Sequence, residues 1–169
     1  IETTDVIAKN GVIHIIDSVI LPPEAMTEPT QNIAEIALAD PDNFSTLVTA
    51  LSAADLVSTL SDNSQTFTVF APTNAAFSAI DPDALSALLA DNAALTSVLL
   101  THVVSDLAIN SVDAYAANGK LIEMASGTQI AVGINSDTGM LTIGGANVII
   151  KDIYATNGVI HVIDTVILE

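Results

Sequence analysis

The side chains best suited to chemistry in this chain are three histidines and a large surplus of carboxylates. His102 and His161 each lie in an apolar run, where an imidazole could act as a general base or bind a metal ion. Such a histidine is more often a core residue held by a hydrogen bond, because buried polar groups are nearly always satisfied. His14 occupies the place of His161 in a repeated segment, so we expect a framework role for these imidazoles.

The other patterns that would indicate an enzyme are absent from the sequence. The chain has no cysteine, no G-x-S-x-G nucleophile elbow and no glycine-rich phosphate loop. The calcium-loop pattern is also missing, although Asn135–Gly139 (NSDTG) resembles half of one. No pair of carboxylates is singled out for glycoside hydrolysis. We therefore predict no catalytic, cofactor-binding or metal site and no cofactor, and keep a hydrolase only as the last alternative.

Charge composition disfavours several classes of partner. Three basic residues stand against 20 acidic ones, giving a net charge of −17. Phosphate contacts need clusters of lysine and arginine, so binding to nucleic acid or to an anionic membrane surface is disfavoured. The acidity favours solubility in a saline exterior, or is simply an acidic surface. No run of about 18 apolar residues predicts a membrane span.

A repeated segment indicates how the chain is organised. Asp5–Leu21 (DVIAKNGVIHIIDSVIL) and Asp152–Leu168 (DIYATNGVIHVIDTVIL) are 147 residues apart and identical at twelve of seventeen positions. This spacing is too long for a solenoid repeat and matches the size of a domain. We predict that residues 1–21 are the closing strand of a preceding domain, that residues 22–29 are a proline-interrupted linker, and that residues 30–169 are a complete domain.

The hydrophobic pattern predicts helices first and strands last within that domain. Helical spacing covers residues 32–39, 44–60 and 84–103, with Thr73 and Asp81 as expected N-caps. Residues 67–70 form an expected strand, whose alternation indicates that both faces are covered. Strands are expected over residues 120–125, 128–134, 140–143, 148–154 and 159–168. This order is the signature of an α+β fold.

Three segments of the domain resemble the fasciclin I domain family. TVFAPTNAAF (Thr68–Phe77) and NGVIHVIDTVI (Asn157–Ile167) are similar to its two signature boxes. LLTHVV (Leu99–Val104) is similar to its Tyr-His motif, with Thr101 at the place of the tyrosine. The resemblance implies a wedge-shaped β sheet with a cluster of N-terminal α-helices, in secreted or surface proteins that mediate adhesion, often as tandem copies. The structural motif residues that it implies are Thr68, Phe70, Pro72, Thr73, Asn74, Phe77, His102, Asn157, Gly158, His161 and Asp164.

The resemblance also implies an interaction surface. In animal members the middle motif and nearby aspartate-containing segments are associated with integrin binding. The corresponding candidates here are Asp40, Asp42, Asp55, Thr101 and His102. Helix capping and solvation are the more usual explanation of the aspartates.

The function predicted from the sequence is a non-enzymatic adhesion or matrix and biofilm interaction domain of a bacterial tandem-repeat surface protein, secreted or held at the cell surface. Its expected partners are a protein or glycan receptor and other fasciclin-like domains. The alternative is a carrier of a small carbohydrate or lipid ligand in a pocket between helices and sheet. Residues 5–21 are expected to pair with a sheet edge, in the same chain or in a neighbouring molecule, since unpaired backbone groups are unfavourable.

Overall fold

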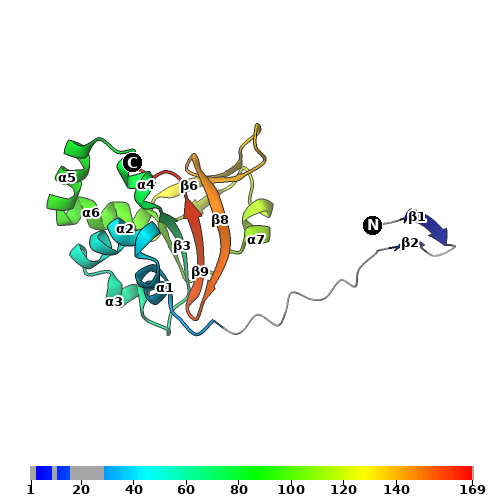
Figure 1. The fold of residues 1–169 in the computed structure, drawn as a ribbon, viewed down its shortest axis with the longest axis horizontal. Coiled ribbons are helices and arrows are strands. Elements are labelled where there is room, and N and C mark those ends of the chain that lie inside the picture. The colour runs from blue at the N-terminus through cyan, green and yellow to red at the C-terminus, as the bar shows by residue number, and fades with distance from the viewer. Residues whose placement is uncertain (1–2, 9–10, 16–28, 169) are drawn as a thin grey trace.

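Most helices lie in the first half of the domain and most strands in the second half in a computed structural model, which describes residues 3–8, 11–15 and 29–168 (Figure 1). The helices are α1 (Ile33–Ala39), α2 (Pro41–Ala53), α3 (Val57–Leu60), α4 (Asn74–Ser78), α5 (Pro82–Ala90), α6 (Asn92–Thr101) and α7 (Ser111–Ala116). The strands of the domain are β3 (Phe67–Pro72), β4 (Val103–Ser105), β5 (Leu121–Glu123), β6 (Gln129–Ile134), β7 (Leu141–Ile143), β8 (Ala146–Ala155) and β9 (Gly158–Ile163). The predicted α+β class is confirmed.

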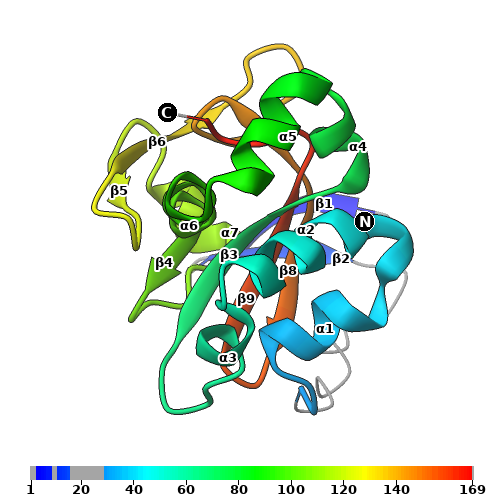
Figure 2. The ribbon, with the colours of Figure 1, turned by 90° about the vertical axis from the view of Figure 1, so that its left-hand side faces the viewer.

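These strands form one mixed sheet in the order β4-β3-β9-β8-β7-β6-β5. β3 and β9 run parallel, with Phe67 opposite Gly158 and Pro72 opposite Ile163, and the other neighbours are antiparallel. Helices α1 to α6 lie along one side of the β3 and β9 strands, and α7 lies beside β8 (Figures 1 and 2). The earliest and latest strands of the domain are therefore central neighbours.

The central strand β3 is buried on both faces, as its sequence predicts. All six of its residues are buried. Phe67, Val69 and Ala71 pack in the core that also holds the helices, whereas Phe70 packs in a second core with residues of β6, β7 and β8. Such a strand can be continuously apolar because neither face meets water.

Side-chain caps begin several of the helices. Asn32 and Glu35 form a reciprocal capping box at α1, in which Asn32 Oδ1 accepts from the Glu35 N–H at 2.9 Å. Thr73 accepts from the Ala76 N–H at the start of α4, and Asp81 caps α5 with Pro82 at its first position. The two caps expected at Thr73 and Asp81 are confirmed.

Two of the predicted helices are each divided in the structure. The expected helix over residues 84–103 is two helices, α5 and α6, because Asp91 accepts from the N–H groups of Ala93 and Ala94 and begins a new helix. The helix expected over residues 44–60 ends at Ala53, and Asp55 follows with φ 57° before α3 begins. The last predicted strand ends at Ile163, not residue 168, and α7 was not predicted.

No single helix in the described part of the chain is both long and apolar enough to cross a membrane. Helices α5 and α6 are long and apolar enough only when taken together, and they are bent by 105° with respect to each other.

The repeated N-terminal segment forms a hairpin. β1 (Thr3–Ala8) and β2 (Gly11–Ile15) make an antiparallel two-stranded sheet of their own. The expectation of one closing strand is therefore wrong for the described residues 3–8 and 11–15, and so is pairing of these strands with the large sheet of the same chain. Residues 16–21, and the side chains of the whole segment, lie outside the described part.

The register of this hairpin repeats that of the second copy. Its pairs are Thr3↔Ile15, Val6↔Ile13, Ile7↔Val12 and Ala8↔Gly11. Adding 147 to each number gives Ile150↔Val162, Ile153↔Ile160, Tyr154↔Val159 and Ala155↔Gly158, which are pairs of β8 and β9. Both hairpins also carry a register shift at the same place, after Thr3 and after Ile150. The two copies therefore share backbone pairing as well as sequence.

Candidate functional site

The three segments that resemble the fasciclin boxes meet at His102. The Phe70 N–H of β3 donates to the His102 carbonyl oxygen at 2.8 Å. The Ile167 N–H donates to His102 Nε2 at 2.9 Å, which attaches the segment after β9 to the end of α6. The Phe70 ring stacks on His161 of β9 with centroids 5.7 Å apart. Residues distant in sequence thus form one contiguous buried network.

His102 is held as a neutral imidazole. Its side chain is 3% exposed, and because Nε2 accepts from Ile167, Nδ1 carries the proton and donates to the Val98 carbonyl oxygen at 2.7 Å. Burial disfavours the charged form and lowers the pKa of His102 to about 4, against the smaller opposite effect of the Val98 carbonyl. Both ring nitrogens are occupied, so neither is available to a substrate or metal ion.

His161 is buried on the opposite side of β3 and uses the other tautomer. Nε2–H donates to the Ile109 carbonyl oxygen at 2.8 Å, and Nδ1 accepts from the Asp152 backbone N–H at 3.3 Å. Burial lowers its pKa, and this outweighs the Ile109 hydrogen bond and the Asp152 charge, which favour the protonated form. This imidazole connects β8, β9 and the segment before α7.

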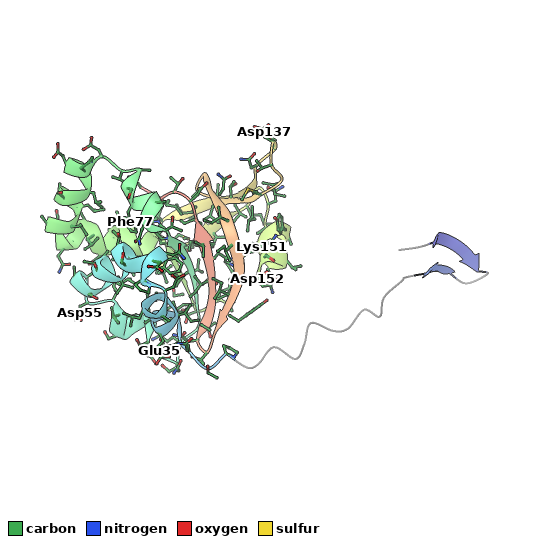
Figure 3. All side chains as sticks on the ribbon, viewed as in Figure 1. Glu35, Asp55, Phe77, Asp137, Lys151 and Asp152 are labelled. Atoms are coloured by element: carbon green, nitrogen blue, oxygen red, sulfur yellow. The ribbon has the colours of Figure 1, made fainter. Side chains whose placement is uncertain are left out.

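Asp152 is a site residue that the sequence reasoning missed. It has φ 62° at the bulge of β8, and its carboxylate accepts from the Ser111 N–H at 2.6 Å and from the Ser111 hydroxyl. Figure 3 shows Asp152 on β8 next to α7, with Lys151 beside it. Lys151 Nζ lies 3.4 Å from the Tyr115 hydroxyl. The available signal was Asp5, the identical residue at the same place in the repeat.

Asn157 and Gly158 fix the turn between β8 and β9. Asn157 Oδ1 accepts from the Ile33 N–H at 3.0 Å, and its Nδ2 donates to the Leu60 carbonyl oxygen at 2.8 Å, so this side chain joins α1 and α3 to the sheet. Gly158 has φ 148°, and a Cβ atom there would lie 1.8 Å from the Phe67 carbonyl oxygen. Only glycine fits this close approach of two strands.

Residues of the first box bind the helices and loops to β3. Thr68 Oγ1 donates to the Leu107 carbonyl oxygen at 2.7 Å and accepts from the Ile109 N–H at 2.8 Å. Asn74 Oδ1 accepts from the Thr46 N–H at 2.9 Å, which joins α4 to α2. The remaining members of this box, Pro72 and Phe77, are buried.

Asp164 closes the other end of the hairpin. Its carboxylate accepts from the Asn147 backbone N–H at 2.9 Å and from Asn147 Nδ2 at 2.8 Å. Burial raises the pKa of Asp164, but the hydrogen bonds from Asn147 and Thr165 together outweigh it and leave the pKa below its ordinary value. Among the described residues, no cluster of three or more metal-ligating side chains occurs.

The predicted interaction surface requires a correction. Thr101 is fully buried and His102 nearly so, because the last turn of α6 faces the core, so neither can contact a receptor in this structure. Asp40 is the N-cap of α2 and accepts from Asn43, whereas Asp42 and Asp55 are exposed. Asp42 and Asp55 lie near opposite ends of α2, a helix of 13 residues that spans roughly 20 Å. The five residues therefore do not form one surface.

A pocket opens between α3 and the β3 and β4 strands. Its volume is about 160 Å³, and its walls are mostly apolar, with three polar side chains. The lining residues are Leu56, Thr59, Leu60, Gln65, Phe67, Leu100, Val103, Ser105 and Ala125. This arrangement suits a small uncharged molecule with a large apolar part.

The comparison with known proteins supports the resemblance seen in the sequence. The sequence model of the Fasciclin domain matches residues 42–169. The chain belongs to the fasciclin domain family. The solved structure of a FAS1 domain pair from the insect cell adhesion molecule fasciclin I is similar over 98% of this chain and 58% of that chain, with a TM-score of 0.72 and 23% identity, and has the same fold.

Two relatives of different length are similar to this fasciclin domain. Transforming growth factor-beta-induced protein ig-h3 of Sus scrofa is 39% identical over 162 residues, which is 95% of this chain and 22% of that protein. The uncharacterized protein sll1735 of Synechocystis is 41% identical over 137 residues, which is 81% of this chain and 97% of that protein. The chain thus spans a small part of one relative and nearly all of another.

Proposed function

We propose that this fasciclin domain is a non-enzymatic adhesion or extracellular-matrix interaction unit of a bacterial surface protein built from tandem copies. The observation that carries the proposal is the β1–β2 hairpin, which repeats the sequence and register of β8 and β9. Tandem copies multiply weak contacts, and linking two modules can raise the overall affinity by about 10² to 10⁴. The insect protein with the same fold, a cell adhesion molecule, contains such a domain pair.

The proposed domain boundaries follow from the same repeat. Residues 1–21 close a preceding domain, residues 22–29 link, and residues 30–169 form a complete domain. The Synechocystis relative supports this division, because 97% of that protein aligns to only 81% of this chain. The pig protein also aligns N-terminal to residue 30, since 95% of the chain exceeds the 140 residues from 30 to 169.

The proposed partners are a protein or glycan receptor and other fasciclin domains, with the protein secreted or at the cell surface. The net charge of −17 argues against nucleic acid and for a receptor site that accepts carboxylates, directly or through a divalent cation. Asp42 and Asp55 are the candidates that remain exposed. Strand-mediated association through residues 5–21 is taken up below.

A binding array of glycans and matrix proteins tests this function. We expect retention of a two-domain chain on at least one component and retention of this chain at least about tenfold weaker. We expect the D42N/D55N variant to weaken binding by about tenfold or more. The D83N/D137N variant also removes two negative charges, but at exposed positions on α5 and on the β6–β7 turn, and it should bind like the wild type. Binding of neither chain to any component would contradict the proposal.

The pocket supports a second candidate, carriage of a small apolar ligand. Its volume of about 160 Å³ is close to that of an engineered apolar cavity, about 150 Å³, that binds benzene in another protein. If the pocket is a binding site, benzene will raise the thermal midpoint of the wild type but not that of the A125L variant, which fills the pocket. The A90L variant, at an exposed position, should respond like the wild type. No benzene-dependent shift in the wild type would remove this candidate.

A further inference from the structure

The chain carries two closing hairpins, and the described structure pairs only one of them with a domain. β8 and β9 lie inside the seven-stranded sheet, whereas β1 and β2 pair only with each other. An isolated two-stranded hairpin is marginally stable in water at best. In the chain as described, the β1–β2 hairpin therefore gains stability if it finds the kind of groove that β8 and β9 occupy.

The groove is defined by the groups that hold the resident hairpin. β3 offers a parallel edge along its whole length from Phe67 to Pro72. Five polar groups on the rest of the domain, outside the hairpin, complete the groove. These groups are the Ile33 N–H for Asn157, the Leu60 carbonyl for Asn157, the Ile109 carbonyl for His161, Ser111 for Asp152, and His102 Nε2 for the Ile167 N–H.

Every residue that meets these groups, and the glycine that passes close to Phe67, is identical in the other copy. The matched residues, 147 positions apart, are Asp5 and Asp152, Asn10 and Asn157, Gly11 and Gly158, His14 and His161, and Ile20 and Ile167. The paired backbone of the two hairpins has the same register and the same bulge. A nearby difference is Lys9 in place of Thr156, whose exposed side chain donates to Asn63 Oδ1. The groups that line the groove meet the same residue types in both hairpins and therefore give little preference for one hairpin over the other.

We propose that the closing hairpin is exchangeable between fasciclin domains: β1 and β2 of one chain, with the segment that follows, dock beside β3 of a second copy in place of its β8 and β9. The exchanged part of the chain, residues 3–21, replaces residues 150–168. The pairing of Asn147 and Ala146 with β7 precedes the exchanged part and stays in place. The product is a non-covalent link between two domains through a complete sheet.

The resident hairpin has the advantage of its covalent attachment. Its effective concentration next to β3 is in the millimolar range expected for short connections, so exchange in dilute solution is limited. The fraction of exchanged hairpins rises with the local concentration of domains, which is high in a tandem protein or on a crowded surface. This inference does not depend on the proposed receptor binding, since a domain could exchange hairpins without adhering to anything.

Gly158 allows a sharp test in the full chain. An alanine at 158 places Cβ against the Phe67 carbonyl oxygen and expels the resident hairpin, whereas Gly11 leaves the other hairpin competent. We expect G158A to fold through the β1–β2 hairpin of a second copy. Its urea midpoint should rise with protein concentration, and size-exclusion chromatography with light scattering should show dimers or larger assemblies. G11A alone should behave like the wild type in both measurements.

The double variant G11A/G158A supplies the decisive comparison. We expect its urea midpoint to lie about 1 M or more below that of G158A, given the usual dependence of stability on denaturant. Equal midpoints for G158A and G11A/G158A would overturn the proposal, because the stability would then not depend on the first hairpin. A stabilised but strictly monomeric G158A would also overturn it, since the hairpin would then dock within its own chain.

The lack of cysteine in the sequence permits a direct trap. Thr156 Oγ1 lies 2.7 Å from Asn63 Oδ1, so a docked first hairpin should bring Lys9 close to Asn63 of the other chain. Mixing K9C/G158A with N63C/G158A under oxidation should give a covalent heterodimer at a yield several-fold above that of the K120C/G158A and N63C/G158A mixture. Equal yields from the two mixtures would contradict docking in this groove.

Discussion

Acidification from pH 6.5 to pH 4 is expected to remove about 3 kcal/mol of stability through His102 alone. The folded protein holds the pKa of His102 at about 4, whereas an unfolded chain has the ordinary value of 6.5. The unfolded state therefore binds the proton first as the pH falls, which favours unfolding. The contribution is fully present above pH 6.5, decreases through this window and levels off below pH 4. Each pKa unit corresponds to about 1.4 kcal/mol.

The H102Q variant isolates this contribution. Glutamine does not titrate, and its amide oxygen can accept from the Ile167 N–H that His102 Nε2 now accepts. Urea unfolding at several pH values should give a difference in stability between wild type and H102Q that shrinks by about 3 kcal/mol between pH 6.5 and pH 4. His161 also has a lowered pKa and acts in the same direction, but it is present in both proteins and cancels. Parallel pH curves would show that His102 does not titrate in this window.

The same bond predicts which part of the domain opens first in acid. Protonation of Nε2 turns an acceptor into a donor that faces the Ile167 N–H. The segment after β9 then loses its attachment to α6, although Val166 and Ile167 still pack in the two cores. Amide exchange at Ile167 is therefore expected to accelerate before global unfolding.

The sequence was most informative where structure is local. The caps at Thr73 and Asp81 could be predicted, because each acts on N–H groups within three residues. The two-sided burial of β3 follows from an unbroken apolar run, and the α+β class follows from the order of the elements. The break at Asp91 was missed even though an aspartate is a good cap, because a continuous apolar pattern runs across it.

The tertiary part of the site could not be predicted from spacing. Ser111 binds Asp152 across 41 residues and Asn157 binds the start of α1 across 124, so no sequence window contains both partners. Thr101 and His102 were placed at a surface because their motif is associated with binding in relatives. Their burial depends on which side of α6 meets the core, and α6 is too uniformly apolar for its sequence to show that side.

The repeated segment was more informative about the closing hairpin than the hydrophobic pattern or the family motifs. The first copy has no described neighbour in the large sheet, yet it adopts the register and the bulge of the second. The positions that are identical between the copies include the bulge residue Asp152 and the turn residues Asn157 and Gly158. In the second copy these residues contact groups outside the hairpin, so the repeat preserves the residue types that attach a closing hairpin to its domain.

Replacing Phe70 with alanine is expected to lower the free energy of unfolding by about 4 kcal/mol, the largest loss that we expect from a single substitution here. Phe70 is 1% exposed at the centre of β3, where its ring contacts the second core and stacks on His161. Removal of a buried aromatic side chain costs about 3 to 5 kcal/mol, because transfer energy is lost and a cavity remains. Since small domains are stable by only about 5 to 15 kcal/mol, F70A should lose between about a quarter and four fifths of that stability.

Two measurements distinguish this cavity from a general effect of losing an aromatic residue. Y154A removes an aromatic side chain that is 37% exposed on β8, and its cost should stay below about 1.5 kcal/mol in the same urea titration. Burial is the main cause of the lowered pKa of His161, so water admitted beside its ring in F70A should move that pKa back toward 6.5. Equal losses for F70A and Y154A, with an unchanged His161 titration by NMR, would contradict the central role assigned to Phe70. The combination of a large loss and a raised His161 pKa would place the Phe70 ring as the barrier that keeps water from the imidazole joining β8, β9 and the loop before α7.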